Sequence, residues 1–301
     1  MRAVNPPRMH GTGPPLVTPF DADGALDEAA LRDLVGWVES RGVDFLVPCG
    51  SNSEAELMTA EERARTIEIV ADEASVPVLA GTGSPGKRET LAATESAADA
   101  GADAALVVTP FYYGHDQATL EAYYREVADE SPIPVSLYSV PAFTDTALDP
   151  ETVGRLASHP NVAGMKDSSG DIAAFQRIRE RTADADFDLM VGSGGVLGQA
   201  LAAGGTGGVL ALANIAPEAT TAIYGAHEAG DDDRARELTA ACVELNHAIT
   251  AEHGIPGLKY AMRQRGAPAG HARSPHRAPG ADARAALDDL LGDLDDLLDG
   301  L

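Results

Sequence analysis

The chain has 301 residues, of which 44% are hydrophobic, and carries a formal net charge of -25 at pH 7. This acidic excess repels nucleic acid and anionic membranes, so we expect neither as a partner, and the scarcity of lysine further predicts a protein adapted to concentrated salt. The sequence has no signal-peptide-like segment and no apolar run long enough to span a membrane, and Cys49 and Cys242 match no CxxC spacing, which predicts a cytoplasmic protein with reduced thiols.

Short apolar runs alternate along the chain with longer segments of helical period. The runs end in Gly, Ser, Thr or Pro and lack apolar–polar alternation, which is typical of parallel strands covered by helices. We expect eight strands, at residues 14–20, 44–50, 76–83, 103–110, 133–140, 161–168, 187–194 and 207–214.

Two of the intervening segments, residues 27–42 and 59–74, have a clear helical pattern. The second opens with Thr59 and Glu62 in the spacing of a capping box. Eight strand–helix units over this length predict an α/β fold, a (β/α)8 TIM barrel over residues 10–230, because an open doubly wound sheet usually has fewer strands.

After the last predicted strand the pattern becomes helical, and we assign residues 231–301 to a C-terminal helical extension. Residues 266–280 are rich in Pro, Gly and Ala and predict a connection. Residues 281–301 combine acidic side chains with leucines at three- and four-residue spacing, which predicts an amphipathic helix that packs on the barrel or on a neighbouring subunit.

Lys166 is one of only three lysines and ends an apolar run, where a charge is costly to bury. Residues at the C-terminal ends of barrel strands meet over one pocket. The period of two along a strand predicts that Val162, Gly164 and Lys166 share a face, and that Lys166 and Tyr138 face inward on adjacent strands.

This pairing has a chemical meaning. An amine held away from water is favoured in its uncharged form and can attack a ketone to form a Schiff base. A phenol within reach, such as Tyr138, can then transfer a proton. The alternative is that Lys166 extends to solvent or pairs with Asp167.

Three loops that follow predicted strands add polar or small residues. The loop GSNSE, residues 50–54, can hold a carboxylate through N–H groups and hydroxyls, and we expect Glu54 to hold this loop by hydrogen bonds. The loop TPFYY, residues 109–113, supplies a second phenol or an aromatic subunit contact. The loop GSG, residues 192–194, leaves room for a ligand. Taken alone, GSNSE is more typical of an ordinary turn, and TPFYY is equally typical of core packing at a subunit contact.

Taken together, GSNSE, TPFYY, YSVPAFT, GMKDSSGD and VGSGG, in this order and spacing, resemble the dihydrodipicolinate synthase/N-acetylneuraminate lyase family of class I aldolases from about residue 10 to residue 265. The resemblance implies a barrel, usually a homotetramer, that uses or releases pyruvate without a metal or cofactor. It also implies that Lys166 forms the Schiff base and Tyr138 is the acid/base. Ser51 and Asn52 would bind the 2-oxo carboxylate, and Tyr112, near a subunit interface, would complete the hydroxyl relay.

Subgroups of this family differ at positions that can be read in the sequence. Dihydrodipicolinate synthases typically carry GTTGE and an arginine two residues after the proline of YNVP, where this chain has GSNSE and Phe143. The stretches GSN, HPNVAGMKDSSGD and GIPGLK look most like 4-hydroxy-2-oxoglutarate aldolases. TPFYY and SGD are also similar to N-acetylneuraminate lyases, and 2-keto-3-deoxygluconate aldolases share the core residues. Ser53 replaces a Gly common in such loops, which leaves the conformation of the turn open.

We therefore predict a lyase that reversibly cleaves a 4-hydroxy-2-oxo or 2-keto-3-deoxy acid to pyruvate and an aldehyde through Lys166. The loops around Phe143, Ser168 and Ser193 are expected to contact the aldehyde part. The alternatives are 4-hydroxy-tetrahydrodipicolinate synthase, which uses pyruvate and aspartate semialdehyde, N-acetylneuraminate lyase, and a non-catalytic 2-oxo acid sensor.

Two other classes of function, nucleotide binding and metal-dependent catalysis, have little support in the sequence. Residues 81–87 almost match a phosphate-binding loop, but Arg88 replaces the hydroxyl residue that magnesium needs, and Pro85 removes an N–H group. The histidines are scattered without an HExxH arrangement, so we expect no metal.

Overall fold

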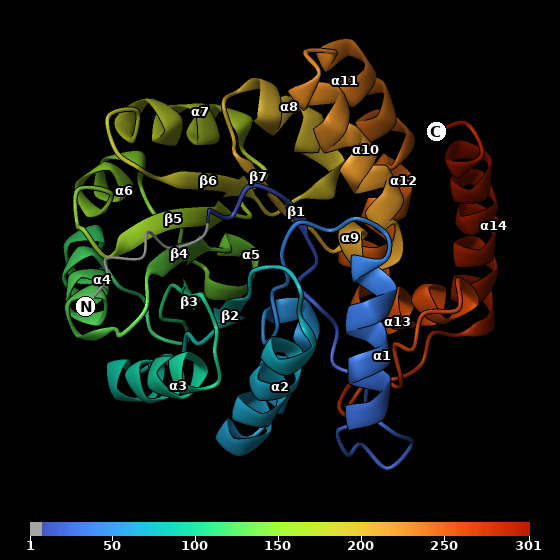
Figure 1. The fold of residues 1–301 in the computed structure, drawn as a ribbon, viewed down its shortest axis with the longest axis horizontal. Helices are drawn as coiled ribbons and strands as arrows, with labels where there is room; N and C mark the ends of the chain where they lie inside the picture. Colours follow the sequence, from blue (N-terminus) through green and yellow to red (C-terminus); the bar gives the residue numbers. More distant parts are fainter. Residues whose placement is uncertain (1–7) are drawn as a thin grey trace.

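A computed structural model, which describes residues 8–301, contains a curled sheet of parallel strands surrounded by helices (Figure 1). Within these residues the sheet has seven strands in the order β1-β7-β6-β5-β4-β3-β2. This is the predicted α/β architecture, with strands and helices alternating along the chain. The strands are β1 (Gly11–Gly13), β2 (Leu79–Gly81), β3 (Ala104–Val108), β4 (Val135–Ser139), β5 (Val162–Asp167), β6 (Asp188–Val191) and β7 (Gly207–Val209).

The corner between β1 and β2 corrects the prediction of eight regular strands. Six of the predicted runs each contain one strand, but β1 ends at Gly13, ahead of the predicted run 14–20. Residues 44–50 pair in β geometry only at Leu46, so the predicted second strand is missing from the sheet. The physical reason is the loss of N–H donors at prolines of this corner, namely Pro14, Pro15, Pro48 and Pro77.

The segment 44–48 still occupies the opening that this irregular corner leaves. It exchanges backbone hydrogen bonds with residues 12–16 on one side and with residues 77–81 on the other. Regular strands therefore do not close the sheet, but this segment bridges its two edge strands, β1 and β2, through backbone hydrogen bonds. The ends of the strands consequently still surround one central space.

Helices cover the outside of the sheet (Figure 1). The second of them begins as predicted, because the N–H of Glu62 donates to Thr59 Oγ1 at 3.2 Å and Glu62 Oε2 accepts from the Thr59 N–H at 2.9 Å. The helices are α1 (Glu28–Glu39), α2 (Ala60–Glu73), α3 (Lys87–Asp99), α4 (Gln117–Glu130), α5 (Pro141–Thr144), α6 (Pro150–Leu156), α7 (Ile172–Arg181), α8 (Leu197–Ala202), α9 (Leu212–Ile215) and α10 (Pro217–Glu228). Single turns η1 (Ser51–Ser53), η2 (Ala55–Leu57) and η3 (Gly194–Val196) lie between strands and helices.

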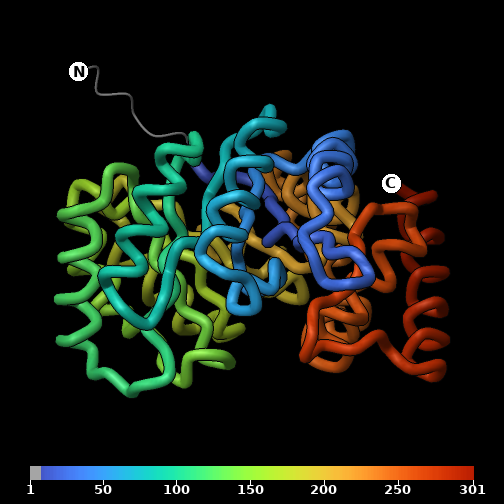
Figure 2. Tube along the Cα trace, turned by 90° about the horizontal axis from the view of Figure 1, so that it is seen from below, coloured from blue at the N-terminus to red at the C-terminus, as the bar shows by residue number. Residues whose placement is uncertain are grey.

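The C-terminal helices gather at one end of the molecule (Figures 1 and 2). The predicted amphipathic helix is confirmed as the last of them, and its Leu287, Leu291 and Leu294 are buried where it packs on the two helices before it. The boundary placed at residue 231 falls in the turn between α10 and the next helix. None of the helices within residues 8–301 has both the length and the hydropathy to cross a bilayer. These elements are α11 (Asp232–Ala241), α12 (Val243–His247), the π turn η4 (Ala248–Glu252), α13 (Gly254–Gln264) and α14 (Ala281–Leu298).

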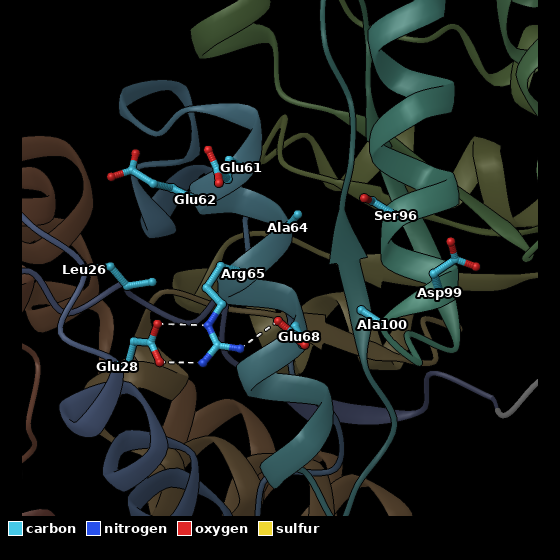
Figure 3. A pocket seen from close by; sticks show the side chains of 10 residues that line it. All are labelled: Leu26, Glu28, Glu61, Glu62, Ala64, Arg65, Glu68, Ser96, Asp99 and Ala100. Carbon is cyan, nitrogen blue, oxygen red and sulfur yellow. Dashed lines mark hydrogen bonds and ion pairs between the residues drawn. The ribbon is translucent and has the colours of Figure 1, made fainter.

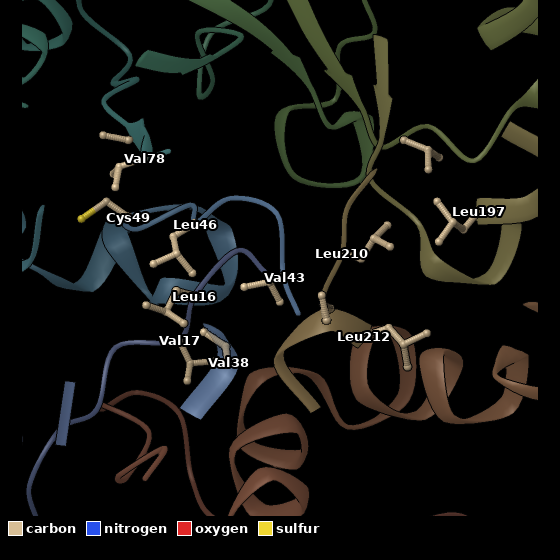
Figure 4. Packing of buried hydrophobic residues seen from close by; sticks show 14 of the residues in the cluster. Leu16, Val17, Val38, Val43, Leu46, Cys49, Val78, Leu197, Leu210 and Leu212 are labelled. Carbon is tan, nitrogen blue, oxygen red and sulfur yellow. The ribbon is translucent and has the colours of Figure 1, made fainter. Parts of the chain in front are cut away.

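Two buried apolar clusters lie on the two faces of the sheet. The larger one fills the space between strands and helices and includes Val135 and Leu137 of β4, and Figure 4 shows part of it. The smaller one lies inside the sheet and includes Tyr138 of the same strand together with Phe45 and Met190. The alternation along β4 therefore follows the predicted parity, with Tyr138 pointing inward.

Candidate active site

Lys166 and Tyr138 lie side by side inside the sheet. They are register partners on β5 and β4, they are 3% and 5% exposed, and Lys166 Nζ lies 4.2 Å from the centroid of the Tyr138 ring. No carboxylate within residues 8–301 forms an ion pair with Lys166. Asp167 instead accepts from the N–H and hydroxyl of Ser169, at 3.1 and 2.8 Å, so both alternatives, solvent exposure and an Asp167 pair, are wrong.

One detail of the predicted parity is also wrong. Val162 does not share the inner face with Gly164 and Lys166, because the pairing of β4 and β5 shifts register after Val162 and leaves Ala163 as an extra residue. Val162 therefore belongs to the outer apolar cluster. The irregularity lies at the start of the strand and leaves the orientation of Lys166 unchanged.

Ser51 joins this pair from a distant part of the sequence. Its Oγ lies 3.2 Å from the hydroxyl of Tyr138, within hydrogen-bond distance. Ser51 is the first residue of the η1 turn, which follows residues 44–50 at the strand ends. The phenol of Tyr138 and the hydroxyl of Ser51 thus form a hydrogen-bonded pair, and the amine of Lys166 lies against the face of the same phenol ring.

Ser53, which replaces a common glycine, fixes the conformation of the η1 turn. Ser53 is not among the residues with positive φ, so the backbone does not require glycine there. The buried Ser53 hydroxyl donates to the carbonyl of Leu16 and accepts from the N–H of Gly50 at 3.0 Å. The serine therefore adds one hydrogen bond that closes the turn and one that holds it against Leu16.

Glu54 ends the turn and holds it by hydrogen bonds, the role expected from the sequence. Its buried carboxylate pairs with Lys259 of α13 and accepts from the backbone N–H of Arg273 at 2.7 Å. Sequence reasoning missed Lys259 and Arg273 as contributors to this region. The available signal was the placement of a scarce lysine in the mostly apolar segment GIPGLK.

The end of β6 lies against the reactive pair. A β-carbon built on Gly192 would lie 1.8 Å from Ser168 Oγ and 3.1 Å from Lys166 Cε, so only glycine permits this approach. Ser168 is thereby placed beside Lys166, and Ser193 follows on the same loop. Both serines are half-buried, which leaves their hydroxyls available at the strand ends.

Three predicted site residues are not bonded to this set within one chain. Asn52 is half-buried in η1, and its side chain has no hydrogen bond to residues 8–301. Tyr112 is 87% exposed with a left-handed φ of 79°, and Phe143 is 72% exposed. The ring of Tyr112 packs edge-on against that of Tyr113, at 5.0 Å between centroids. The Tyr112 hydroxyl takes no part in the hydrogen bond between Ser51 and Tyr138.

The signals for a nucleotide site do not assemble into one. The near phosphate-binding loop forms the turn from β2 to α3, and Lys87 Nζ donates to Glu126 at 2.7 Å and to Glu130 at 3.2 Å. Figure 3 shows a separate surface groove at α2 and α3, where Arg65 is already bonded to Glu28 and Glu68 and further acidic residues line the walls. The lysine of the loop is therefore paired with carboxylates, and the groove is lined mainly by acidic side chains, which repel a phosphate.

Comparisons with known proteins identify the family of this chain. A family model described as the dihydrodipicolinate synthetase family matches residues 8–293. A 4-hydroxy-tetrahydrodipicolinate synthase of Methanothrix thermoacetophila is 39% identical over 95% of this chain and 97% of its own length. An uncharacterized DapA-like lyase of Halobacterium salinarum is 40% identical over 96% and 95% of the two chains.

Solved structures give the same result. YagE, a prophage protein of the dihydrodipicolinic acid synthase family from E. coli K12 in complex with pyruvate, superposes with a TM-score of 0.91 and 31% identity, covering 96% of this chain and 99% of that one. Dihydrodipicolinate synthase DapA-2 of Bacillus anthracis superposes with a TM-score of 0.91 and 28% identity, covering 95% and 98%.

Proposed function

The chain belongs to the dihydrodipicolinate synthetase family of carbon–carbon lyases, and from this premise we propose that it acts on pyruvate through a Schiff base on Lys166. The observation that carries the proposal is a buried amine with no carboxylate partner within residues 8–301, held 4.2 Å from the Tyr138 ring. An amine in such a place is a nucleophile toward a ketone. The same set argues against a non-catalytic sensor, which needs no proton-transferring phenol.

The reaction follows from these groups. The neutral amine of Lys166 adds to the ketone of the 2-oxo acid, and water leaves as the imine forms. The protonated imine withdraws electrons from the adjacent carbon, which gives an enamine either by losing a proton or by losing an aldehyde as the carbon–carbon bond breaks. In the condensation direction the enamine carbon adds to the aldehyde carbon, and the aldehyde oxygen takes up a proton. Tyr138, bonded to Ser51 at 3.2 Å, transfers the protons that these steps require.

The carboxylate of pyruvate is assigned to the η1 turn. Ser51 and Asn52 contribute backbone N–H groups and side-chain donors, and the Asn52 amide has no competing bond within residues 8–301. Tyr112 is assigned to the relay through a subunit contact, because an exposed ring with a left-handed backbone needs a neighbouring surface to hold it. A homo-oligomer with the exposed Tyr112, Tyr113 and Phe143 at or near its contacts follows from this assignment.

The second substrate has two candidates. Curated relatives named 4-hydroxy-tetrahydrodipicolinate synthase, at 39% and 40% identity, support the condensation of pyruvate with aspartate semialdehyde, which we therefore place first. The exposed apolar Phe143 favours the other candidate, cleavage of a 4-hydroxy-2-oxo or 2-keto-3-deoxy acid. Phe143 occupies the position where the synthases typically carry an arginine that binds the carboxylate of aspartate semialdehyde.

Borohydride reduction in the presence of pyruvate, followed by peptide mass analysis, tests the Schiff base. The expected result is a pyruvate adduct on the peptide that contains Lys166, and its absence would refute the mechanism. Rates with pyruvate plus aspartate semialdehyde, measured beside pyruvate release from a panel of hydroxy-2-oxo acids, then decide between the two candidates. Activity with neither set, and no pyruvate release from N-acetylneuraminate, would leave only the sensor.

A further inference from the structure

The carboxylate of Glu54 is fully buried directly after the turn that carries Ser51 and Asn52. One of its oxygens pairs with Lys259 Nζ, and the other accepts from the Arg273 N–H at 2.7 Å. The backbone of Glu54 has φ 57° and ψ 33°, a left-handed conformation that costs a residue with a side chain free energy. The two bonds at the carboxylate hold the residue in that conformation.

Lys259 brings helix α13 to this carboxylate. Its side chain is 1% exposed, and Nζ donates to the carbonyl of Thr18 at 2.6 Å and to the carbonyl of His271 at 2.8 Å as well as to Glu54. The ring of Phe20 lies 4.6 Å from Nζ. All three N–H donors of the ammonium are therefore used, and removal of one partner would leave a buried charge without compensation.

Arg273 fixes the segment that offers its N–H to Glu54. Its guanidinium makes two bonds of 2.7 Å to the carboxylate of Glu62 and further bonds to the carbonyls of Gly24 and Leu57. It also stacks on Phe20, with 4.0 Å from the guanidinium carbon to the ring centroid. The connection between α13 and α14 is thus anchored on both sides of the η2 turn.

A short chain of hydrogen bonds connects Glu54 to the reactive residues. The N–H of Glu54 donates to the carbonyl of Ser51 at 3.3 Å, and the hydroxyl of Ser51 lies 3.2 Å from that of Tyr138. A shift of Glu54 therefore moves the turn that faces the substrate carboxylate. Displacements of about 1 Å at such a position can cost about a hundredfold in rate.

We propose that Glu54 is a positioning residue, and that Lys259 and Arg273 hold it so that residues 259–273 of the C-terminal segment form part of the active-site scaffold. The proposal rests on the assignment of the η1 turn to the carboxylate of pyruvate. It differs from a general stabilising role because it requires the grip on pyruvate, and not only the fold, to depend on these bonds.

The variant Glu54→Gln/Lys259→Met removes both buried charges, which avoids leaving one of them unpaired. Glu121→Gln is the matched control, because Glu121 of α4 forms ion pairs with Arg125 and Arg155, and none of these residues bonds to Glu54, Lys259 or Arg273. We expect the double variant to raise the KM for pyruvate by about tenfold or more, with a smaller change in kcat at saturation. The control should lower the Tm and change this KM by less than about twofold. An equal rise in KM in both variants, or in neither, would overturn the proposal.

A second measurement on the wild-type protein covers the case in which the double variant does not fold. Because coupling between two sites is reciprocal, binding of pyruvate at the η1 turn should slow backbone hydrogen exchange in residues 259–273, which are linked to that turn through Glu54. Lys166→Ala should show no such protection. If borohydride traps pyruvate on the wild-type enzyme but exchange in residues 259–273 stays unchanged, the positioning role is refuted while the Schiff base stands. If no adduct forms, the proposed function itself fails.

Discussion

Tyr138 and Lys166 are paired across β4 and β5 in strict register, and the amine lies 4.2 Å from the centroid of the phenol ring. Hydrogen bonds of the two strands fix the two backbone positions side by side, so both side chains leave the sheet on the same face. The ring also covers one side of the amine and keeps water from it. The reactive pair is therefore placed by the regular part of the fold, and the loops add the remaining contacts.

Lys166→Ala should abolish both the borohydride-trapped pyruvate adduct and turnover, because the alanine side chain has no nucleophile and the other buried lysine, Lys259, is bonded to Glu54. The far-UV circular dichroism spectrum and the Tm should show an intact fold. Lys87→Ala is the control, since that amine lies at the surface beside Glu126. Adduct formation in the Lys166 variant would mean that another amine carries the chemistry.

Tyr138→Phe should lower the rate of adduct formation and kcat on the order of a hundredfold, because the ring still packs on Lys166 while the transferable proton is lost. Ser51→Ala should cost less, since the phenol remains and only its 3.2 Å partner is removed. Single-turnover formation of the adduct and steady-state rates measure both effects. A Tyr138 variant as active as the wild type would remove the phenol from the mechanism.

The sequence predicted the parts of this site that depend on local periodicity. Period-two parity and the position of a strand in the order of the barrel were enough to place Lys166 beside Tyr138, and a capping box was enough to start α2. The bulge that turns Val162 outward was not predictable, because nothing in residues 161–168 distinguishes a regular strand from one with an extra residue. The irregular second run could have been inferred from Pro48 within it and from Pro14, Pro15 and Pro77 in the runs on either side.

Long-range electrostatic contacts were beyond sequence reasoning. Glu54 meets Lys259 and Arg273 over separations of 205 and 219 residues, and no local pattern links such partners. Their meeting depends on how α13 and the segment after it fold back over the strand ends. Only the rarity of lysine and its place in an apolar helix face marked Lys259 as unusual.

Phe143→Arg should raise the efficiency with aspartate semialdehyde on the order of tenfold over an uncharged aldehyde, because a guanidinium binds the second carboxylate with paired hydrogen bonds. Phe143 is 72% exposed, so the longer side chain can be accommodated without repacking. Phe143→Leu controls for loss of the ring. The ratio of kcat/KM for the two aldehydes is the readout, and an unchanged ratio would place the specificity elsewhere.

The buried pair should also give the protein a characteristic dependence of stability on pH. Burial lowers the pKa of Lys259 from its ordinary value of 10.5 to about 8, and the Glu54 carboxylate opposes this shift. Between these two values the unfolded chain binds more protons than the folded one, so the free energy of unfolding rises with pH from about 8 to 10.5, by up to about 3 kcal/mol. Below pH 8 both states are protonated and this contribution is flat.

Denaturant unfolding at pH 7.5 and pH 10 of the wild type and of Glu54→Gln/Lys259→Met checks this dependence. The wild type should gain stability relative to the variant at the higher pH. Cys49, whose pKa burial raises to about 12, changes stability in the opposite direction but does so in both proteins and cancels in the difference. An identical pH dependence in the two proteins would contradict the assignment of the titration to Lys259.

Salt should stabilise the protein strongly, because the acidic side chains that give the net charge of -25 repel one another. This repulsion extends over about 30 Å at 0.01 M salt but over only about 3 Å at 1 M. Helix α14 carries part of this repulsion, because the exposed Asp289, Asp293 and Asp296 follow one another at four- and three-residue spacing and the last two approach the negative end of the helix. The Tm should therefore rise steadily with potassium chloride concentration. Asp293→Asn/Asp296→Asn should raise the Tm in dilute buffer and leave it nearly unchanged in concentrated salt. If the Tm of the wild type does not fall on dialysis into dilute buffer, the acidic surface is not a salt adaptation. If the variant gains the same Tm at both salt concentrations, these aspartates act through helix propensity rather than through charge.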